Sequence, residues 1–283
     1  MSKCSATIVH MSRLMKLLRK SPSFDADETS PANIRRRLIH IEQKIDDLLS
    51  RVNGSGSRDH PDQAFGRESF AQHGEDMIVM NILHALGIAR PTYLDIGAHH
   101  PVNISNTALL YKLGGRGVNV EANPDLIGAF HEQRPEDTNL NVGVGAKPGT
   151  MPFYRIDNWS GRNSFDRATV DAFVRSNPDF ALNDTISVDV VTPREIVETC
   201  FHDRPLNFLS LDVEGSDLEI LKVFPFDIAR PDIICVEVLS GDGTDLSAEM
   251  SRVLAGQDYC AVSKTVGNII YVQKDKRDVV LPR

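Results

Sequence analysis

The sequence lacks several features that would place it in common protein classes. Its 283 residues contain no run approaching the roughly 18 apolar residues of a membrane span. The N-terminus carries basic residues but no continuous apolar segment, so we expect no secretory signal. Only four cysteines occur, with no CxxC pair and no zinc-finger spacing. These absences favour a reduced, cytoplasmic protein.

Basic residues are also scarce over most of the chain. The net charge is −8, but residues 1–57 hold ten Lys and Arg against six Asp and Glu, a balance of +4. Residues 58–283 hold 21 basic and 33 acidic residues, a balance of −12. A nucleic-acid groove needs a basic footprint, so this acidic part argues against nucleic-acid binding. The asymmetry predicts an extension at residues 1–57, separate from a main domain over residues 65–275.

Two segments of the extension have helical patterns. Met11–Lys20 is a short basic amphipathic stretch; a solvated helix is the simpler interpretation, and weak contact with an anionic membrane surface is the alternative. Apolar residues recur at spacings of 4, 3, 4, 3 and 4 within residues 34–52, at Ile34, Leu38, Ile41, Ile45, Leu48 and Val52. This seam predicts a short coiled-coil-like helix that favours a homo-oligomer, with packing on its own domain as the alternative. Residues 53–57 resemble a flexible linker.

From about Phe65 the pattern changes to alternating strands and helices. Apolar strands are predicted at 92–96, 117–120, 140–144, 152–156, 206–211 and 233–238, and a final antiparallel pair at 261–263 and 268–273. Helices are predicted at 75–86, 105–113, 124–133 and 246–254. The alternation predicts an α/β fold with a mostly parallel sheet covered on both faces by helices. Ligands bind such sheets at the carboxyl ends of the strands.

Acidic and small residues follow the predicted strands. Asp95 and Gly97 end the first strand, Glu121 ends the second, and Asp212 with Glu214 follows the strand at 206–211. A carboxylate at Glu121 suits the two ribose hydroxyls of an adenosine group, because an ionised carboxylate only accepts hydrogen bonds. The GxGxxG turn of dinucleotide sites is absent, which disfavours a nucleotide-dependent oxidoreductase. An acidic pocket suits the positive sulfonium of S-adenosylmethionine and would repel a diphosphate.

An ordered set of segments runs between Ser69 and Gln273. The segments are Ser69–Asp76 (SFAQHGED), Tyr93–Pro101 (YLDIGAHHP), Ser105–Thr107 (SNT), Leu110–Val118 (LYKLGGRGV), Glu121–Pro124 (EANP) and Leu209–Gly215 (LSLDVEG), which Glu219 follows. Together they resemble the FkbM-type S-adenosylmethionine-dependent methyltransferases. The resemblance implies a class I methyltransferase fold, Rossmann-like with seven strands. It also implies methyl transfer to a hydroxyl, commonly on a sugar or a natural product.

The resemblance also implies roles for residues at matching positions. Glu121 would hold the ribose with Asn123 beside it, while Asn141 and Val142 would flank the adenine. The residues that would bind the cofactor are Gln72, Glu75, Asp95, Gly97, Ala98, Asn106, Glu121, Asn123, Asn141 and Val142. The pair His99–His100 departs from the family, whose members often carry small polar residues there.

A hydroxyl acceptor needs a base, and three residues are candidates. Asp212 and Glu214 would point to one side in extended geometry, one as base and the other as its orienter. His99 is an alternative base, since histidine titrates near neutral pH. Capping of a helix that begins near Ser216 is the alternative interpretation of the two acids, and catalysis or cofactor contact is favoured because strand ends face the cleft in this fold. Together with Glu237 they would also offer oxygen ligands to a divalent cation, although no motif indicates a metal.

The sequence indicates the residues that would bind the acceptor less clearly. Trp159, Arg162 and Asn163 lie in a polar loop, where an aromatic ring could stack on a sugar and the polar groups could bind its hydroxyls. An ordinary surface loop explains the same residues equally well. The sequence therefore favours an O-methyltransferase acting on a glycan or glycosylated metabolite. A non-catalytic, methyltransferase-like scaffold subunit assembled through residues 34–52 is the alternative.

Overall fold

The computed structural model describes residues 68–240 and 243–281, so the extension predicted at residues 1–57 lies outside the described residues. The main sheet consists of β1 (Thr92–Ile96), β2 (Arg116–Val120), β3 (Thr138–Leu140), β7 (Phe208–Leu211), β8 (Ile233–Glu237), β9 (Tyr259–Lys264) and β10 (Asn268–Gln273). Their order across the sheet is β3-β2-β1-β7-β8-β10-β9. All neighbours pair in parallel except β10, which is antiparallel to both β8 and β9. The predicted seven-stranded, mostly parallel sheet is confirmed.

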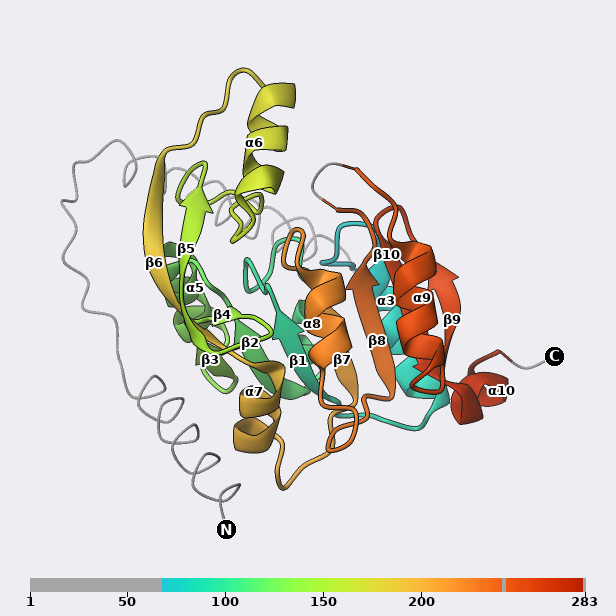
Figure 1. The fold of residues 1–283 in the computed structure, drawn as a ribbon. Coiled ribbons are helices and arrows are strands. Elements are labelled where there is room, and N and C mark those ends of the chain that lie inside the picture. The colour runs from blue at the N-terminus through green and yellow to red at the C-terminus, as the bar shows by residue number, and fades with distance from the viewer. Residues whose placement is uncertain (1–67, 241–242, 282–283) are drawn as a thin grey trace, which may run out of the picture. The chain divides into compact units, whose positions relative to one another are not determined.

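Helices cover both faces of this sheet (Figure 1). One face carries α3 (Glu75–Ala85), α4 (Ala108–Lys112) and α5 (Pro124–Gln133), and the other carries α7 (Pro193–Cys200), α8 (Asp217–Val223) and α9 (Ser247–Ala255). The alternation of side chains along β1 explains this division. Leu94 and Ile96 enter the core under α7, α8 and α9, whereas Tyr93 packs with α3 and α4. A 3₁₀ turn, η2 (Lys274–Lys276), and α10 (Arg277–Val280) end the described chain.

A second, smaller sheet follows β3. It consists of β4 (Gly143–Val144), β5 (Gly149–Arg155) and β6 (Asp184–Val191) in the order β4-β6-β5, with α6 (Arg167–Ser176) in the connection between β5 and β6. Figure 1 shows β5, β6 and α6 extending from the side of the main sheet that carries β2 and β3. The sequence pattern indicates neither β6 nor α6 as an element of this unit.

The single strand predicted over residues 140–144 is wrong. Leu140 pairs with Val120 in the main sheet, but Gly143 pairs with Val190 in the second sheet. Between them the Asn141 side chain donates a hydrogen bond to the backbone carbonyl of Glu121, at 2.8 Å, and the chain changes sheets there. The sequence pattern does not reveal this change of sheet, because Leu140, Val142 and Val144 are all buried.

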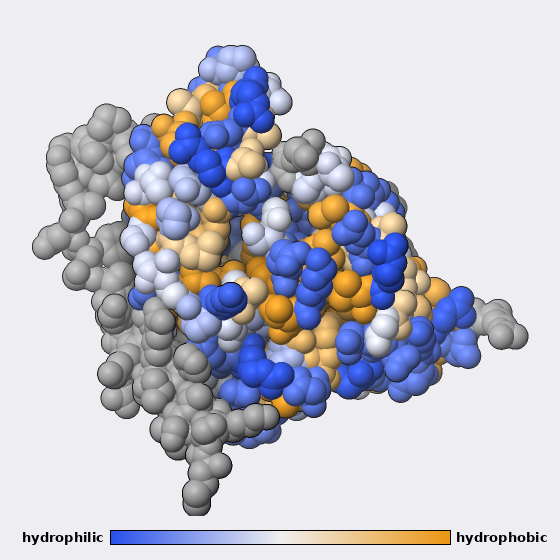
Figure 2. Space-filling view, viewed as in Figure 1, coloured by the Kyte–Doolittle hydropathy of each residue, from blue (hydrophilic) through white to orange (hydrophobic). Residues whose placement is uncertain are grey.

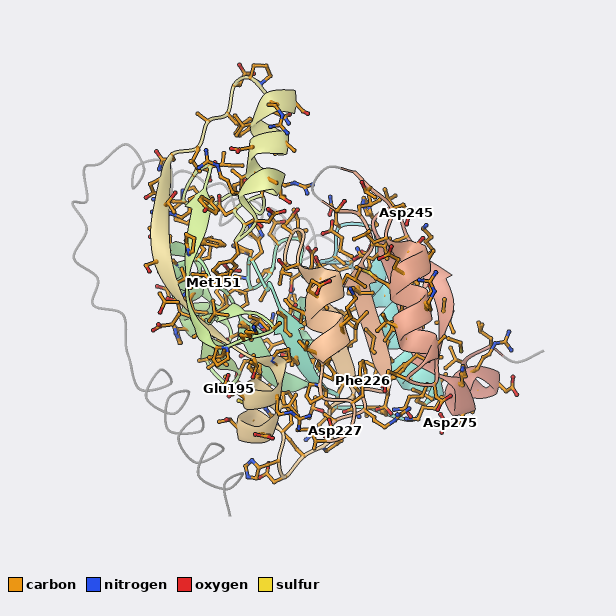
Figure 3. All side chains as sticks on the ribbon, viewed as in Figure 1. Met151, Glu195, Phe226, Asp227, Asp245 and Asp275 are labelled. Carbon is orange, nitrogen blue, oxygen red and sulfur yellow. The ribbon has the colours of Figure 1, made fainter. Side chains whose placement is uncertain are left out.

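The helix ends have recognisable capping residues. Asn123 caps α5 by accepting the N–H of Asp125 at 3.1 Å, and Pro124 stands in the first turn. At α7, Thr192 and Glu195 form a reciprocal capping box: the hydroxyl accepts the Glu195 N–H, and the carboxylate accepts the Thr192 N–H at 2.7 Å. Figure 3 shows Glu195 at this end of α7. The helix predicted over 105–113 is shorter than expected, because residues 105–107 form polar contacts ahead of it.

Apolar packing continues under the loop between α8 and β8. The rings of Phe224 and Phe226 lie 4.9 Å apart between centroids, and the Phe226 ring lies 5.7 Å from that of Tyr259. Phe226 is labelled in Figure 3. On the face that carries α8 and α9, hydrophilic side chains alternate with apolar ones (Figure 2). Within residues 68–240 and 243–281, no helix combines the length and apolar character that a membrane span requires.

Candidate active site

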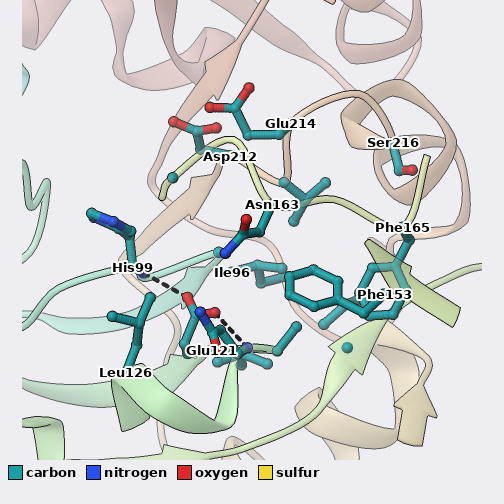
Figure 4. Close-up of a pocket in the computed structure, with 18 of the residues that line it drawn as sticks. Ile96, His99, Glu121, Leu126, Phe153, Asn163, Phe165, Asp212, Glu214 and Ser216 are labelled. Atoms are coloured by element: carbon teal, nitrogen blue, oxygen red, sulfur yellow. Dashed lines mark hydrogen bonds between the residues drawn. The ribbon is translucent and has the colours of Figure 1, made fainter. Parts of the chain in front are cut away.

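An open pocket lies beside the carboxyl ends of β1, β2 and β7 (Figure 4). Strand β1 is flanked by β2 on one side and by β7 on the other, so this is the point where the strand order reverses. Ligand sites of open α/β sheets are expected at this place. Residues 156–165, which connect β5 to the start of α6, complete the wall and are called the cover loop below.

Gly97 allows the ends of β1 and β7 to come together. Its φ of 81° lies in the left-handed region, and a Cβ atom there would sit 1.7 Å from the carbonyl oxygen of Asp212. Gly97 also lines the pocket, as the sequence predicts for a residue near a ligand. The close approach that demands glycine is therefore one between two backbone segments.

Glu121 lies at the floor of the pocket, buried at the end of β2. Its carboxylate accepts the backbone N–H of His99 at 2.8 Å and that of Asn123 at 2.7 Å (Figure 4). Burial raises the pKa of Glu121, while these hydrogen bonds oppose the rise. Each carboxylate oxygen has a second lone pair, so Glu121 can still accept hydrogen bonds from a ligand diol.

One end of the pocket is apolar and aromatic. Phe153 of β5 and Phe165 of the cover loop lie with ring centroids 4.8 Å apart and planes inclined by 56°. The Phe165 ring rests on Gly143, where a Cβ atom would be 2.3 Å from the ring. Val142, predicted beside the adenine, lies in the same wall. This end suits a flat, mostly apolar ring.

The opposite end of the pocket is lined by Asp212 and Glu214, which together with the neighbouring Glu237 are called the carboxyl cluster below. Asp212, Glu214 and Glu237 each place an oxygen within 4.8 Å of the others. The sequence correctly predicts that Asp212 and Glu214 converge, but the extended geometry expected for them is wrong. Strand β7 ends at Leu211, and Glu214 has a φ of 54°, so a turn brings the two carboxyl groups together.

Helix α8 does not take its cap from this pair. Asp217, inside its first turn, accepts the backbone N–H of Val213 at 2.9 Å and that of Gly215 at 3.2 Å. The residue at the cap position, Ser216, makes no side-chain capping bond. Helix capping therefore does not account for Asp212 and Glu214, whose side chains face the pocket instead.

Burial and mutual repulsion raise the pKa values of the carboxyl cluster, so its members keep their protons to higher pH. Burial, followed by the charge of Asp212, raises the pKa of Glu214 to about 7 and that of Glu237 to about 10. Burial also raises the pKa of Asp212, while a hydrogen bond from Glu237 and the charge of Arg162 oppose the rise. Near neutral pH the cluster therefore contains a protonated Glu237 beside Asp212. Glu214 is then about half protonated, because its pKa lies close to this pH.

The cover loop is attached to the ends of three strands. Arg162 forms an ion pair with Glu214 at 2.6 Å, and its side chain is 46% exposed at the rim. The Nε2 atom of His99 lies 3.0 Å from the carbonyl of Trp159, and Asn123 donates to the carbonyl of Asn158 at 3.0 Å. Because a carbonyl only accepts, the His99 contact places the proton on Nε2, which disfavours that nitrogen as a base.

The predicted acceptor residues occupy different positions in this loop. Asn163 is buried and lines the pocket, but its amide is engaged locally: it donates to the carbonyl of Asp157 and accepts the N–H of Ile156. Arg162 lies at the rim, and neither it nor Trp159 forms part of the pocket wall.

Several predicted cofactor residues lie outside the pocket wall. Glu75 is buried and accepts hydrogen bonds from Thr265 at 2.6 Å and Asn268 at 3.1 Å, which joins α3 to the turn before β10. Asn106 donates to Ser210 at 3.1 Å. The remaining residues outside the wall are Gln72, Asp95, Ala98 and Asn141. The pocket itself brings together Gly97, His99, Glu121, Asn123, Val142, Asn163, Asp212 and Glu214.

Sequence reasoning missed the aromatic end of the pocket. Phe153 belongs to a strand of the second sheet and Phe165 to a loop, and both join the pocket only through the pairing of β5 with β6 and of Tyr154 with Ser164. No local pattern distinguishes these two rings from ordinary core residues. Glu237, by contrast, ends β8 and lies next to the end of the strand predicted over residues 233–238, so its position could be found from the strand-end rule.

Comparison with known proteins gives one family match. The family model described as Methyltransferase FkbM domain matches residues 95–259, more than half of the chain. No curated protein matches the chain significantly. Among solved structures, the 1,6-didemethyltoxoflavin-N1-methyltransferase of Burkholderia thailandensis, with bound 1,6-didemethyltoxoflavin and S-adenosylhomocysteine, is a remote neighbour. It is 13% identical, with a TM-score of 0.37 over 89% of this chain and 94% of that chain.

Proposed function

Since the chain belongs to the FkbM family of S-adenosylmethionine-dependent methyltransferases, we propose that it methylates a hydroxyl group, on a sugar of a glycan or glycosylated metabolite. The observation that carries the proposal is the carboxyl cluster at one end of the pocket, where Asp212 and Glu214 face the cavity. A hydroxyl becomes a good nucleophile only when its proton is removed, and a positioned carboxylate can remove it.

The chemistry of the pocket fits S-adenosylmethionine. Glu121 would accept hydrogen bonds from the ribose hydroxyls, and the slot beside Phe153 and Phe165 would take the adenine. The acidic end would favour the positive charge of the sulfonium. When bound, the cofactor supplies an electrophilic methyl group on that sulfur. The remaining tasks, alignment of the acceptor and removal of its proton, belong to the chain's own residues.

Glu214 has the acidity that a base at neutral pH needs. A base works best when its pKa lies near the working pH, and such catalysis contributes about 10²–10⁴-fold to the rate. The pKa of Glu214 is raised to about 7 by burial and by Asp212. We assign Glu214 as the base and Asp212 as its orienter, with the opposite assignment as the alternative. Glu237, protonated beside Asp212, would hold that carboxylate in place.

The rim of the pocket supports an acceptor with several hydroxyls. Arg162 is half exposed and pairs with Glu214, so a polar group of the acceptor can replace either partner in this ion pair. Trp159 belongs to the same loop and offers an aromatic surface of the kind that packs on sugar faces. Asn163, whose amide is engaged within the loop, would shape the wall instead of binding the acceptor.

Transfer of a labelled methyl group tests the proposal. Purified protein would be incubated with methyl-labelled S-adenosylmethionine and a panel of sugars and cell-envelope glycans, with and without a chelator. We expect label in at least one hydroxyl-bearing acceptor. Dependence on a divalent cation would assign the carboxyl cluster to metal binding. Label exclusively on nitrogen would refute the proposed acceptor class.

Variants of the cluster separate catalysis from folding. Glu214→Gln and Asp212→Asn should each lower turnover by at least about 10²-fold, because proton removal fails. Glu136→Gln is the control: its side chain is 55% exposed, pairs with Arg116 and lies outside the pocket wall, so its turnover should not change. Folded wild-type protein that binds no S-adenosylhomocysteine would instead support the non-catalytic scaffold.

A further inference from the structure

The residue assigned as the base has an unusual main-chain conformation. Strand β7 ends at Leu211, and Glu214 in the turn that follows has a φ of 54°. This left-handed region is uncommon for residues other than glycine, and a residue stays there only when the surrounding structure holds it. The next residue, Gly215, has a φ of 117°, and a Cβ atom there would lie 2.9 Å from the hydroxyl oxygen of Thr169. The turn that brings Glu214 beside Asp212 therefore depends on contacts from other elements.

Ser164 of the cover loop contacts the main chain of Glu214. Its hydroxyl donates to the carbonyl oxygen of Glu214 at 2.9 Å and accepts the N–H of Asp166 at 3.0 Å. Only 1% of Ser164 is exposed, so water does not compete for this bond. The main chain of Ser164 pairs with that of Tyr154 on β5 in both directions, at 2.9 and 3.1 Å. The second sheet therefore fixes Ser164, and Ser164 in turn holds the main chain of Glu214.

Arg162 of the same loop contacts the side chain of Glu214. Its Nη1 atom lies 2.6 Å from the Glu214 carboxylate, and among the described residues the guanidinium hydrogen-bonds to Glu214 alone. The Arg162 side chain is 46% exposed, in contrast to the buried Ser164. A polar group of the acceptor can therefore displace the Arg162 contact while the Ser164 contact stays in place.

The charged groups around the Glu214 carboxylate make its pKa a measure of its position. Burial and the charges of Asp212 and Asp217 raise this pKa to about 7, whereas Arg162 opposes the rise. Glu237 of β8 faces the same carboxylate, and its own pKa is raised in part by Glu214. A Glu214 side chain that left this position would lose both its burial and the repulsion from Asp212. Its pKa would then fall toward the ordinary value of 4.5.

We propose that Ser164 and Arg162 are positioning residues for the base. Ser164 keeps the main chain of Glu214 in its left-handed turn, and Arg162 holds the carboxylate until a polar group of the acceptor replaces it. The inference rests on the role of Glu214 in the proposed function, and it adds the residues that place this base. Neither Ser164 nor Arg162 lines the pocket, so both act through Glu214. The second sheet, through Ser164, thereby takes part in placing the base.

Carbon-13 NMR of labelled glutamate side chains measures the pKa of Glu214 in the full chain, without cofactor or acceptor, and Glu214→Gln identifies its signal. Wild type should titrate at about pH 7. Ser164→Ala should titrate at least about one pH unit lower, because the carboxylate leaves its buried position. Arg162→Gln should titrate at higher pH, because a positive charge is lost. Thr199→Val is the control: it removes a hydroxyl bonded to the carbonyl of Glu195 in α7, outside the pocket wall, and should titrate as wild type does.

Opposite shifts in the two variants separate positioning from general loosening of the loop. Ser164→Cys, whose thiol is a weak donor, should also lower the pKa of Glu214, and it provides a second measurement if Ser164→Ala does not fold. A pKa of about 7 in the serine variants, or a lowered pKa in Arg162→Gln, would overturn the inference. A wild-type pKa near 4.5 would also overturn it, because Glu214 would then not be held beside Asp212. Since no methyl group is transferred in this experiment, a failure of O-methylation with these shifts intact would refute the proposed function alone.

Discussion

At the scale of single residues, burial gives similar carboxyl groups different tasks. Glu121 and Glu214 both line the pocket. Glu121 accepts two backbone N–H groups, which hold it as a rigid acceptor of hydrogen bonds. Glu214 instead faces Asp212 and Arg162, and burial together with the Asp212 charge brings its pKa to about 7. The first arrangement suits binding and the second suits proton transfer.

Replacement of Glu121 tests the binding role. Glu121→Gln keeps the shape but loses the charge and one acceptor oxygen, so we expect about a tenfold weaker affinity for S-adenosylhomocysteine by calorimetry. Glu136→Gln is a suitable control, because Glu136 is exposed and pairs with Arg116 at the start of β2, away from the pocket. Unchanged affinity in Glu121→Gln would remove this residue from the cofactor site.

The pH dependence of turnover tests the base. Glu214 accepts a proton only when ionised, so kcat/KM should rise with pH through about 7, where the pKa of Glu214 lies. Glu214→Gln should lose this rise along with most of the activity. A Glu214→Gln variant that keeps the same rise would assign the titration to another group.

Residues at strand ends could be predicted from the sequence, and residues brought in by tertiary contacts could not. Gly97, Glu121 and Asp212 follow apolar runs, and the strand-end rule places them at one edge of the sheet. Phe165 has no such signal. Its position depends on how the second sheet packs.

At the scale of secondary-structure elements, local patterns predict some helices and strands at both ends and miss others. Helix α5 and strand β10 agree with the predicted ranges at both ends. Helix α7 was not predicted, although its capping box is visible in the sequence as Thr192, Pro193 and Glu195. The split between β3 and β4 could not be predicted, because it depends on which sheet each half joins.

The cap of α7 is expected to stabilise the face that carries α7, α8 and α9. Thr192→Ala removes one half of the capping box, which should lower the free energy of unfolding by about 1 kcal/mol in urea denaturation. Thr192→Ser retains the hydroxyl and should stay within a few tenths of a kcal/mol, roughly, of wild type. Equal stabilities of the Ala and Ser variants would show that the hydroxyl contributes nothing to α7.

At the scale of the whole molecule, the buried carboxyl groups of the described residues lower the stability of the folded state at neutral pH. The pKa values of Glu214 and Asp217 are raised to about 7 and that of Glu237 to about 10, each first by burial. Between about pH 4.5 and 7 the folded state therefore binds more protons than the unfolded state at these groups. Stability falls with rising pH wherever the folded state binds more protons.

The excess of protons bound by the folded state predicts how its stability changes with pH. The free energy of unfolding should decrease as pH rises from about 5 to 7.5, by on the order of 1 kcal/mol per pH unit. Glu75 and Asp184, whose pKa values are lowered, act below this window. Urea denaturation at several pH values measures the profile, and Glu237→Gln should flatten it. Stability that rises over this range would contradict the buried, protonated cluster.

The apolar seam over residues 34–52 concerns the assembly of the whole molecule. Self-association through this seam remains a prediction from the sequence. Deletion of residues 1–57 should reduce the mass measured by light scattering to that of one chain, because the apolar spacing over residues 34–52 is lost. Deletion of residues 1–33 alone is the control and should leave the mass per assembly nearly unchanged. A full-length protein that is already monomeric would refute self-association through this segment.

The central claim is that the carboxyl cluster directs methyl transfer to a hydroxyl. The most direct measurement is carbon-13 NMR of the product formed from methyl-labelled S-adenosylmethionine by wild type, by Glu214→Gln and by Glu136→Gln. The account predicts an O-methyl resonance from wild type and Glu136→Gln, and its near absence from Glu214→Gln. A methyl resonance on nitrogen or carbon, or an O-methyl product formed equally well by Glu214→Gln, would contradict it.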